Sequence, residues 1–450
     1  MPEIQAKVFI DKVLEEHIKE KLTNPINTIR TIPFRNWLTE EARKVFRIPT
    51  EYCLFRKNNG RISTKINTYE TTKAELVSDD EKTQKIIFDF LGREDPTENR
   101  ALKSLLKKNG QKDPVIITAD GFVIDGNRRL WALKTLNEEY PGKFEYINVV
   151  VLPGTDEDPP THQEICRLEL RHQNQKTGKS EYTGINKAIQ NRRYIREINL
   201  TLTEILKDDP FYSDLPDKKF ESAKKKFEID NFGTLDLVDK YLKSRNQEGD
   251  YESVEDRWLS FQELNQRIIS KFEDTNFTNK YRIQDHDKGL IQAAAFNFIQ
   301  LKRTGDLVPK NVNLIRDITD WITTDKKEFL KIGKIEDENT TGDPIEKDAE
   351  WQELQGEEIK AQVKKLQNLA RKDELAAGPV YRLEEALRNL EHKELDIRNY
   401  KTIPIKVLEK SFELTRDIEN INNGLKSYFY NEIKNVNTNK NSEVFTKKKK

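Results

Sequence analysis

The chain has 450 residues, of which 35% are hydrophobic and 35% are charged, and its 78 basic side chains balance its 78 acidic ones. This length accommodates about two to four domains. The charge balance excludes the overall basic excess that would by itself indicate nucleic-acid binding, so a nucleic-acid-binding surface would have to be a local basic patch. A cytoplasmic protein outside the membrane is expected, because the sequence has no apolar run of about eighteen residues and Cys53 and Cys166 lack the spacing of a disulfide framework or a zinc site.

Residues 1–95 are expected to form short helices and a β-hairpin that pack on a central domain. Apolar residues at helical spacing predict one or two amphipathic helices within residues 1–45. The turn sequence NNG at 58–60 separates two short runs, 52–57 and 61–67, and residues of these types accept the positive φ of a hairpin turn. The periodicity predicts a further helix at 81–90.

The central domain is expected to span residues 96–160. The segment DPTE at 95–98 has the pattern of a helix start, and NG at 109–110 ends that helix. Two apolar runs flank ADG at 119–121 and predict a tight β-turn between short strands at 115–118 and 122–124. Residues 144–152 are rich in Val, Ile and aromatics and predict another strand of the same sheet.

The sequence IDGNRR at 124–129 places a glycine and two arginines where a strand passes into a helix. A helix N-terminus has unpaired backbone N–H groups and a partial positive charge, and Gly126 lets an anion approach the backbone closely. Arg128 and Arg129 add guanidinium groups, which bind phosphate in bidentate fashion. The residues indicate a phosphate site, with the alternative that Asp125 only caps the helix and the arginines are surface charges.

Residues 161–330 are expected to be a helical region, which THQE at 161–164 opens with a capping box. Between residues 167 and 198, eight basic side chains stand against three acidic ones, the strongest local basic excess in the chain. We interpret it as a DNA-binding surface that includes Lys187, Arg192, Arg193 and Arg196. Helical pieces at 203–206, 219–227 and 234–243 allow a helix-turn-helix-like unit as a further alternative.

Residues 331–350 are acidic and rich in Thr, Gly and Asp, which is typical of a linker. Residues 351–450 are expected to be a C-terminal helical region, where apolar residues at helical spacing from Trp351 predict a helical hairpin or short coiled coil. This region is the candidate surface for a protein partner or for oligomer formation.

The segment GQKDPVIITADGFVIDGNRRLWAL, residues 110–133, resembles the N-terminal domain of ParB partition proteins and of the wider ParB/sulfiredoxin superfamily. Those domains have a helix that ends in Gly, a Gln-x-x-Pro approach, a hairpin, and a Gly-x-x-Arg turn that opens a helix. The matching positions here are Gln111, Pro114, Gly126, Arg128, Arg129 and Ala132. The resemblance covers roughly residues 96–200. It implies an α+β fold, a small mixed-sheet domain with flanking helices, followed by a mostly α-helical C-terminal half.

The resemblance implies that the turn binds the phosphates of a nucleoside triphosphate, CTP or ATP, together with Mg²⁺. The phosphate-binding residues would be Gly126, Asn127, Arg128 and Arg129. In ParB-like proteins a downstream Glu-Asn segment helps to hold the metal. Asn174 matches that asparagine, but Gln173 stands in place of the carboxylate, and a neutral amide is a much weaker magnesium ligand. Glu169, one helical turn earlier, is the expected substitute as metal ligand and as catalytic carboxylate.

Sulfiredoxins carry a catalytic cysteine just after the glycine of this turn, where this chain has Asn127, so sulfinic acid reduction is not expected. The leading hypothesis is a cytoplasmic bacterial, ParB-like nucleotide-binding protein associated with DNA in partition, regulation or defence. One alternative is a DNA-binding adaptor in which the arginine turn is structural. Another is a magnesium-dependent phosphoryl-transfer enzyme, such as an NTPase or kinase, or a nuclease.

Overall fold

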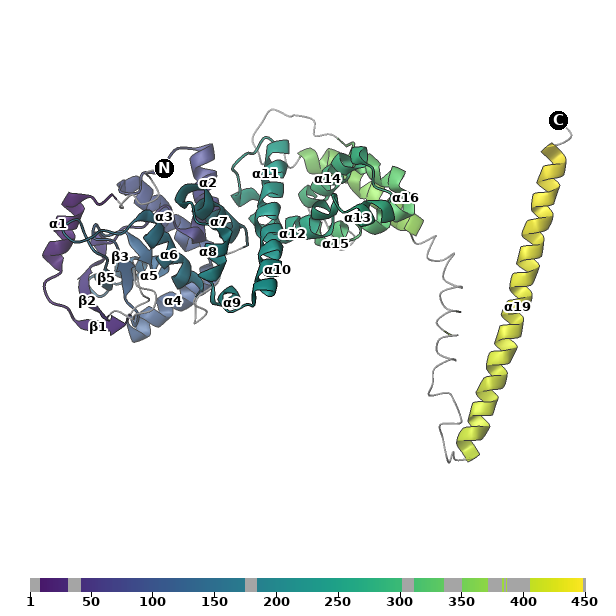
Figure 1. Ribbon diagram of the computed structural model, residues 1–450, viewed down its shortest axis with the longest axis horizontal. Helices are drawn as coiled ribbons and strands as arrows, with labels where there is room; N and C mark the ends of the chain where they lie inside the picture. Colours follow the sequence, from purple (N-terminus) through teal and green to yellow (C-terminus); the bar gives the residue numbers. More distant parts are fainter. Residues whose placement is uncertain are drawn as a thin grey trace. The chain divides into compact units, whose positions relative to one another are not determined.

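The computed structural model describes residues 9–30, 42–174, 184–301, 311–335, 350–370, 383, 386 and 405–447. The chain divides into two compact units, Met1–Ala370 and Arg371–Lys450. The first unit contains all the described strands and most of the described helices, and the second contains the long helix α19 (Ile405–Lys447) (Figure 1). The α+β fold class is therefore confirmed.

The first unit contains a five-stranded mixed sheet with the strand order β1-β2-β5-β3-β4. Strand β3 runs parallel to β5, and all the other neighbours are antiparallel. The strands are β1 (Asn27–Arg30), β2 (Ala42–Pro49), β3 (Val115–Ile117), β4 (Val123–Asp125) and β5 (Tyr146–Val151). The predicted β3–β4 turn and the strand at 144–152 are confirmed, whereas β1 and β2 lie partly where only helices were expected.

Helices cover the sheet and complete its core, as Figure 1 shows for α3, α4 and α5. Their bounds are α1 (Lys12–Lys21), α2 (Ser63–Thr72), α3 (Glu81–Glu94), α4 (Pro96–Asn109) and α5 (Asn127–Glu139). The predicted start of α4 is confirmed, because the Asp95 side chain accepts a hydrogen bond of 3.2 Å from the N–H of Glu98. A shared hydrophobic core joins these helices to the central strands, with Ile87, Leu130 and Val149 fully buried.

The hairpin predicted around residues 58–60 is wrong. The Asn59 side chain instead accepts a hydrogen bond of 3.0 Å from the N–H of Arg61, which caps a short 3₁₀ turn, η3 (Gly60–Ile62). That turn leads directly into α2. An Asn-Gly pair can begin a helical turn as readily as it can reverse a strand, because an asparagine side chain is also a good helix cap.

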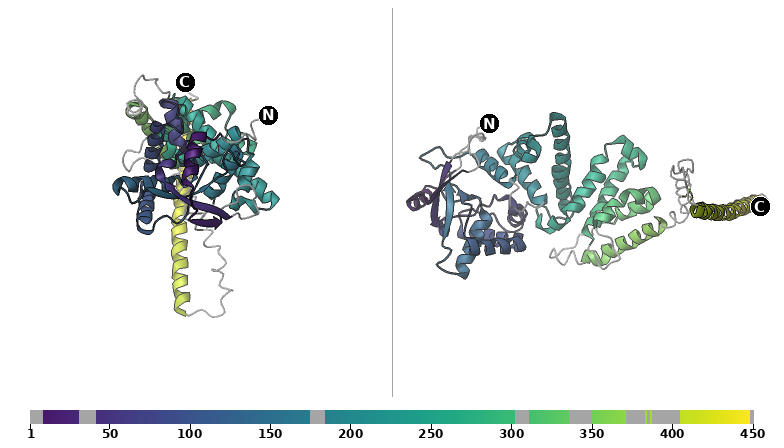
Figure 2. Two further views of the ribbon diagram at one scale, coloured as in Figure 1. Left: turned by 90° about the vertical axis from the view of Figure 1, so that its left-hand side faces the viewer. Right: turned by 90° about the horizontal axis from the view of Figure 1, so that it is seen from below.

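The remainder of the first unit is helical, as expected for residues 161–330, and continues to residue 370. Figure 2 shows this part from two further directions. A second hydrophobic core unites it, which includes Ile185 from α7, Phe261 from α12 and Phe298 from α14. The helices are α6 (His162–Asn174), α7 (Gly184–Ile198), α8 (Leu202–Lys207), α9 (Pro210–Ser213), α10 (Asp217–Phe227), α11 (Thr234–Ser244), α12 (Trp258–Arg267), α13 (Thr275–Lys280), α14 (Asp285–Gln300), α15 (Asn311–Arg316) and α16 (Ile318–Ile332).

No turn separates the last two of the three helical pieces for which a helix-turn-helix-like unit was suggested, 219–227 and 234–243. A single π-helical segment, η4 (Glu228–Gly233), joins α10 to α11, so the two pieces run on as one helix (Figure 1). The segment η4 contacts α12, where the Asn265 side chain donates a hydrogen bond of 2.7 Å to the carbonyl of Ile229. The apolar positions on both pieces therefore belong to one continuous helix.

The expected linker at 331–350 lies largely outside the described residues. The helical periodicity predicted from Trp351 is confirmed as far as residue 370, where Trp351, Ile359, Val363 and Leu366 are buried in the second core. None of the helices that the structure describes is long and apolar enough to cross a membrane.

Candidate functional site

The junction between β4 and α5 depends on the backbone conformation of Gly126. Its φ of +103° lies in the left-handed region, and it forms the N-cap of α5. A Cβ at this position would lie 2.7 Å from Cγ2 of Val115 and 3.2 Å from the Arg129 guanidinium. Both the conformation and the close packing therefore require glycine.

The N-terminus of α5 differs from those of the neighbouring helices. Asp11, Asp80 and Asp95 each cap α1, α3 or α4 by accepting a hydrogen bond from a first-turn N–H. Gly126 has no side chain with which to do this, and the first turn of α5, Asn127-Arg128-Arg129, contains no acidic residue. The N-cap residue of α5 therefore supplies no carboxylate to this helix end, an arrangement that suits an external anion.

Arg129 is part of the structural support of the turn. Its Nη1 donates to the backbone carbonyls of Asp113 at 2.7 Å and Pro114 at 2.9 Å, and its Nη2 donates to Asp125 Oδ2 at 2.6 Å. The guanidinium thus ties the approach to β3, the end of β4 and the start of α5 together. Of the two alternatives for this residue, these contacts favour a structural role over binding a ligand.

Arg128 lies on the side of α5 that faces α4. Its Nε donates a hydrogen bond of 3.0 Å to Asn99 Oδ1, and the Asn99 side chain is itself fixed by donating to the carbonyl of Leu91 at 2.8 Å. Burial lowers the pKa of the Arg128 guanidinium, and the nearby positive charge of Arg61 lowers it further. The carboxylates of Asp95 and Glu98 act on the guanidinium in the opposite direction.

Helix α6 brings two ionisable side chains to the other side of the turn. His172 Nδ1 lies 3.8 Å from Asp125 Oδ2, next to Gly126. Glu169, one turn earlier, is only 3% exposed. Burial raises the pKa of its carboxyl, which the positive charges of Arg56 and Arg193 only partly counteract. Its Oε2 has no hydrogen-bond partner among the residues that the structure describes, and it lies 4.0 Å from Nη1 of Arg56.

The predicted site residues are thus brought together in part. Gly126, Asn127 and the start of α5 lie beside Asp125. The negative charge of Asp125 helps to raise the pKa of the Glu169 carboxyl. Arg128 extends toward α4, and the side chain of Asn174 lies outside the described part of the chain. Sequence reasoning missed Arg56, because it lies far upstream of the motif and no local pattern marks it.

The residues do not fit the implied Mg²⁺ at Glu169. A divalent cation there would have the Arg56 guanidinium as an immediate neighbour and would also feel the charge of Arg193. Across the described ranges, no three His, Cys, Asp or Glu side chains are grouped so that they could hold a metal ion. The expectation of Glu169 as a metal ligand therefore lacks a suitable environment.

The predicted basic surface requires correction at Arg192 and Arg193, whose side chains are only 13% and 14% exposed. Arg192 forms an ion pair with Asp239 and donates a hydrogen bond of 2.8 Å to the Tyr251 hydroxyl. Arg193 pairs with Glu197 at 2.8 Å and donates to the carbonyl of Asn58. Arg192 thus joins α7 to α11, and Arg193 joins α7 to the loop that precedes η3. Of the four predicted DNA-binding residues, Arg196 is exposed and Lys187 is half-buried.

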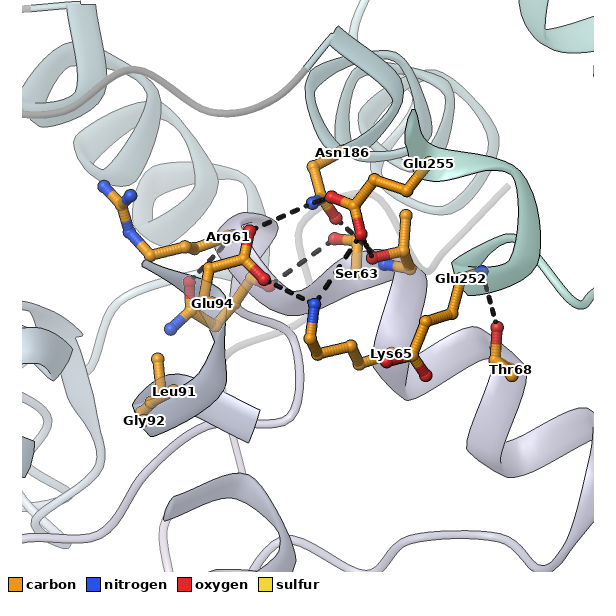
Figure 3. Close-up of polar contacts among 12 residues, drawn as sticks. Arg61, Ser63, Lys65, Thr68, Leu91, Gly92, Glu94, Asn186, Glu252 and Glu255 are labelled. Atoms are coloured by element: carbon orange, nitrogen blue, oxygen red, sulfur yellow. Dashed lines mark hydrogen bonds and ion pairs between the residues drawn. The ribbon is translucent and has the colours of Figure 1, made fainter. Parts of the chain in front are cut away.

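A second polar cluster lies where the two hydrophobic cores of the first unit meet (Figure 3). Lys65 of α2 contacts Glu94 of α3 at 2.6 Å and Glu255 at 3.6 Å. Asn186 of α7 donates a hydrogen bond of 2.9 Å to Glu255 and accepts one of 2.9 Å from the N–H of Thr64. Glu255 lies in the 3₁₀ segment η5 (Glu252–Arg257). The sequence gives no local signal for this cluster, because its members come from four separate elements.

No protein-family model matches this chain, and no curated protein matches it significantly.

Proposed function

We propose that this protein binds the phosphate groups of a nucleotide at the N-terminus of α5, in the manner of ParB-like domains. The observation that carries the proposal is the start of α5, whose N-cap Gly126 lacks the carboxylate that the N-caps of α1, α3 and α4 possess. Backbone N–H groups at such a helix end bind phosphate, and a glycine N-cap allows the close approach.

Three further features support a ligand at this position. Arg128 is the second residue of α5, and the bond from its Nε to Asn99 orients a guanidinium of the kind that binds phosphate. Arg129 holds the turn in a fixed geometry by its bonds to Asp113 and Pro114. The buried Glu169 oxygen without a hydrogen bond among the described residues independently indicates that a polar group is received beside the turn.

The proposal is tested by calorimetry with CTP and with ATP on the full chain. We expect one of them to bind the wild-type protein, and Arg128→Ala to weaken that binding about ten- to hundredfold, the loss typical of a charge-assisted hydrogen bond. Arg100→Ala is the matched control, since Arg100 is an exposed arginine of α4 and should leave the affinity unchanged.

Arg128→Lys separates loss of binding from loss of folding, because it keeps the positive charge but cannot hold phosphate in bidentate fashion. Circular dichroism would verify that each variant is folded. Equal affinity in the wild-type and Arg128→Ala proteins, or no nucleotide binding in either, contradicts the proposal.

A further inference from the structure

Two buried side chains beside the turn approach each other without forming a hydrogen bond. Arg56 is 16% exposed, and its one polar contact within the described part of the chain is the 4.0 Å approach of Nη1 to Glu169 Oε2. That oxygen likewise has no hydrogen-bond partner among the described residues. Leaving buried charged groups without hydrogen bonds is costly, so this arrangement calls for a functional explanation.

The backbone that leads into Arg56 is fixed by its neighbours. The preceding residue, Phe55, is buried, and its N–H and carbonyl are both hydrogen-bonded at 2.8 Å by the side chain of Gln84. One residue earlier, Leu54 pairs with the start of β4: its N–H donates to Gly121 and its carbonyl accepts from Val123, each at 2.9 Å.

Glu169 is equally constrained, because α6 is buried on two sides. Leu168 packs with the apolar side chains of β3 and β4, and Leu170 packs in a separate cluster with Tyr194 of α7. The backbone N–H of Gly60 lies close enough to the carboxyl to lower its pKa. Both side chains are thus carried on well-anchored backbone, and at 4.0 Å between Nη1 and Oε2 each lacks a hydrogen bond that a third group could supply.

The chemistry of the two side chains defines that group. A guanidinium only donates hydrogen bonds, and a carboxylate accepts them. A group that lies between them and satisfies both must accept from Arg56 and donate to Glu169, which is what a hydroxyl does. An anion alone would be repelled by the carboxylate, and a cation by the guanidinium.

The position of this pair relative to the turn suits a nucleotide. His172, one helical turn after Glu169, lies against Asp125, which directly precedes Gly126. Glu169 therefore lies one helical turn, about 5 Å along α6, from the histidine that contacts the residue before the turn. We propose that Arg56 and Glu169 together recognise a ribose hydroxyl of the nucleotide whose phosphates bind at the start of α5. This inference rests on the proposed function.

The experiment compares the ribonucleotide that binds best, CTP or ATP, with its 2′,3′-dideoxy counterpart on the full-length protein. We expect the wild-type protein to bind the dideoxy form about ten- to hundredfold more weakly, as loss of hydrogen bonds to charged groups predicts. Arg56→Met and Glu169→Gln should each weaken ribonucleotide binding toward the dideoxy level and remove the discrimination. Arg100→Met, at an exposed site, should retain it in full.

The outcomes separate this inference from the proposed function. Equal affinity of the wild-type protein for both nucleotides overturns the ribose site but leaves phosphate binding intact. Discrimination that persists in both Arg56→Met and Glu169→Gln also overturns it, since water would then be the group between the two side chains. If neither nucleotide binds the wild-type protein, both proposals fall.

Discussion

Gly126 is the single residue on which the geometry of the turn depends most directly. Gly126→Ala would place a Cβ 2.7 Å from Val115 in a backbone conformation that L-residues rarely adopt. Such strain costs about 1–3 kcal/mol. We therefore expect the free energy of unfolding, measured by urea denaturation, to fall by about that amount, and nucleotide binding to be lost.

Gly289→Ala provides the matched control for this substitution. Gly289 lies within α14, its φ is not positive, and a Cβ there would meet nothing within 4 Å. Alanine is favoured over glycine in a helix by about 0.5–1 kcal/mol, so this variant should be slightly more stable than the wild-type protein. If Gly126→Ala were as stable as Gly289→Ala, the left-handed turn would not be needed.

The turn around Gly126 could be predicted from the sequence, but the roles of its individual side chains could not. Glycine followed by two arginines is a local pattern, and the structure places it at the expected strand-to-helix junction. What Arg129 does is decided by the carbonyls of Asp113 and Pro114, which lie sixteen and fifteen residues away. Arg56 reaches Glu169 across more than a hundred residues of sequence, and no spacing rule anticipates such a contact.

Among the elements, the contact of α2 and α3 with α7 and η5 holds the two hydrophobic cores of the first unit together. Lys65 is the positive charge at its centre, 9% exposed and paired with Glu94 and Glu255. Lys65→Met would leave two buried carboxylates facing each other, and breaking a buried ion pair costs about 3–5 kcal/mol. Chemical denaturation should show a loss of that order.

An exposed ion pair of the same kind serves as the comparison. Lys85 and Glu81 of α3 are also paired, at 2.7 Å, but their side chains are mostly exposed, so Lys85→Met should change the stability by less than about 1 kcal/mol. The double variant Lys65→Met/Glu94→Leu should recover part of the lost stability, because it removes one of the two carboxylates that have lost their positive partner. A cost for Lys65→Met no larger than that for Lys85→Met would contradict the role of the cluster.

The pH dependence that the Lys65 charge contributes has a definite sign. Burial opposes the charge of Lys65, but its hydrogen bond to Glu94 and the attraction of the neighbouring carboxylates outweigh burial and raise its pKa. A group whose pKa is raised by folding stabilises the protein fully below its unfolded pKa. Its contribution is lost as the pH rises through the folded value. We expect this contribution to disappear only in strongly alkaline solution.

Elements were predictable where their signals are local. The start of α4 depends on Asp95 and Pro96 alone, and the capping box that opens α6 is formed by the Thr161 and Glu164 side chains, as predicted. The wrong hairpin and the missed continuity of α10 with α11 have a common cause. In both cases, contacts with distant residues decide between two local conformations that the sequence permits, as Asn265 does at the π-bulge.

Over the whole molecule, the hydrophobic cores end before the second unit begins. Every buried hydrophobic side chain that the structure describes lies at or before Leu366. In α19, by contrast, Ile418, Ile421, Leu425 and Tyr428 are all more than a third exposed. Their alternating spacing of three and four residues is typical of a coiled-coil seam. The sequence-based expectation of a partner or oligomer through the C-terminal helices therefore remains a prediction.

Deletion of residues 371–450 tests this division of the chain. Because the described core residues all precede the deletion, we expect the fragment to unfold within about 2 °C of the full-length protein in calorimetry, and to bind nucleotide with the same affinity. Light scattering should show that the full-length protein self-associates through the exposed seam of α19 and that the fragment is monomeric. A large drop in the unfolding temperature would mean that the C-terminal residues cover part of the first unit. Identical assembly states of the two proteins would remove α19 as the oligomer interface, since the seam would then have no partner copy to meet.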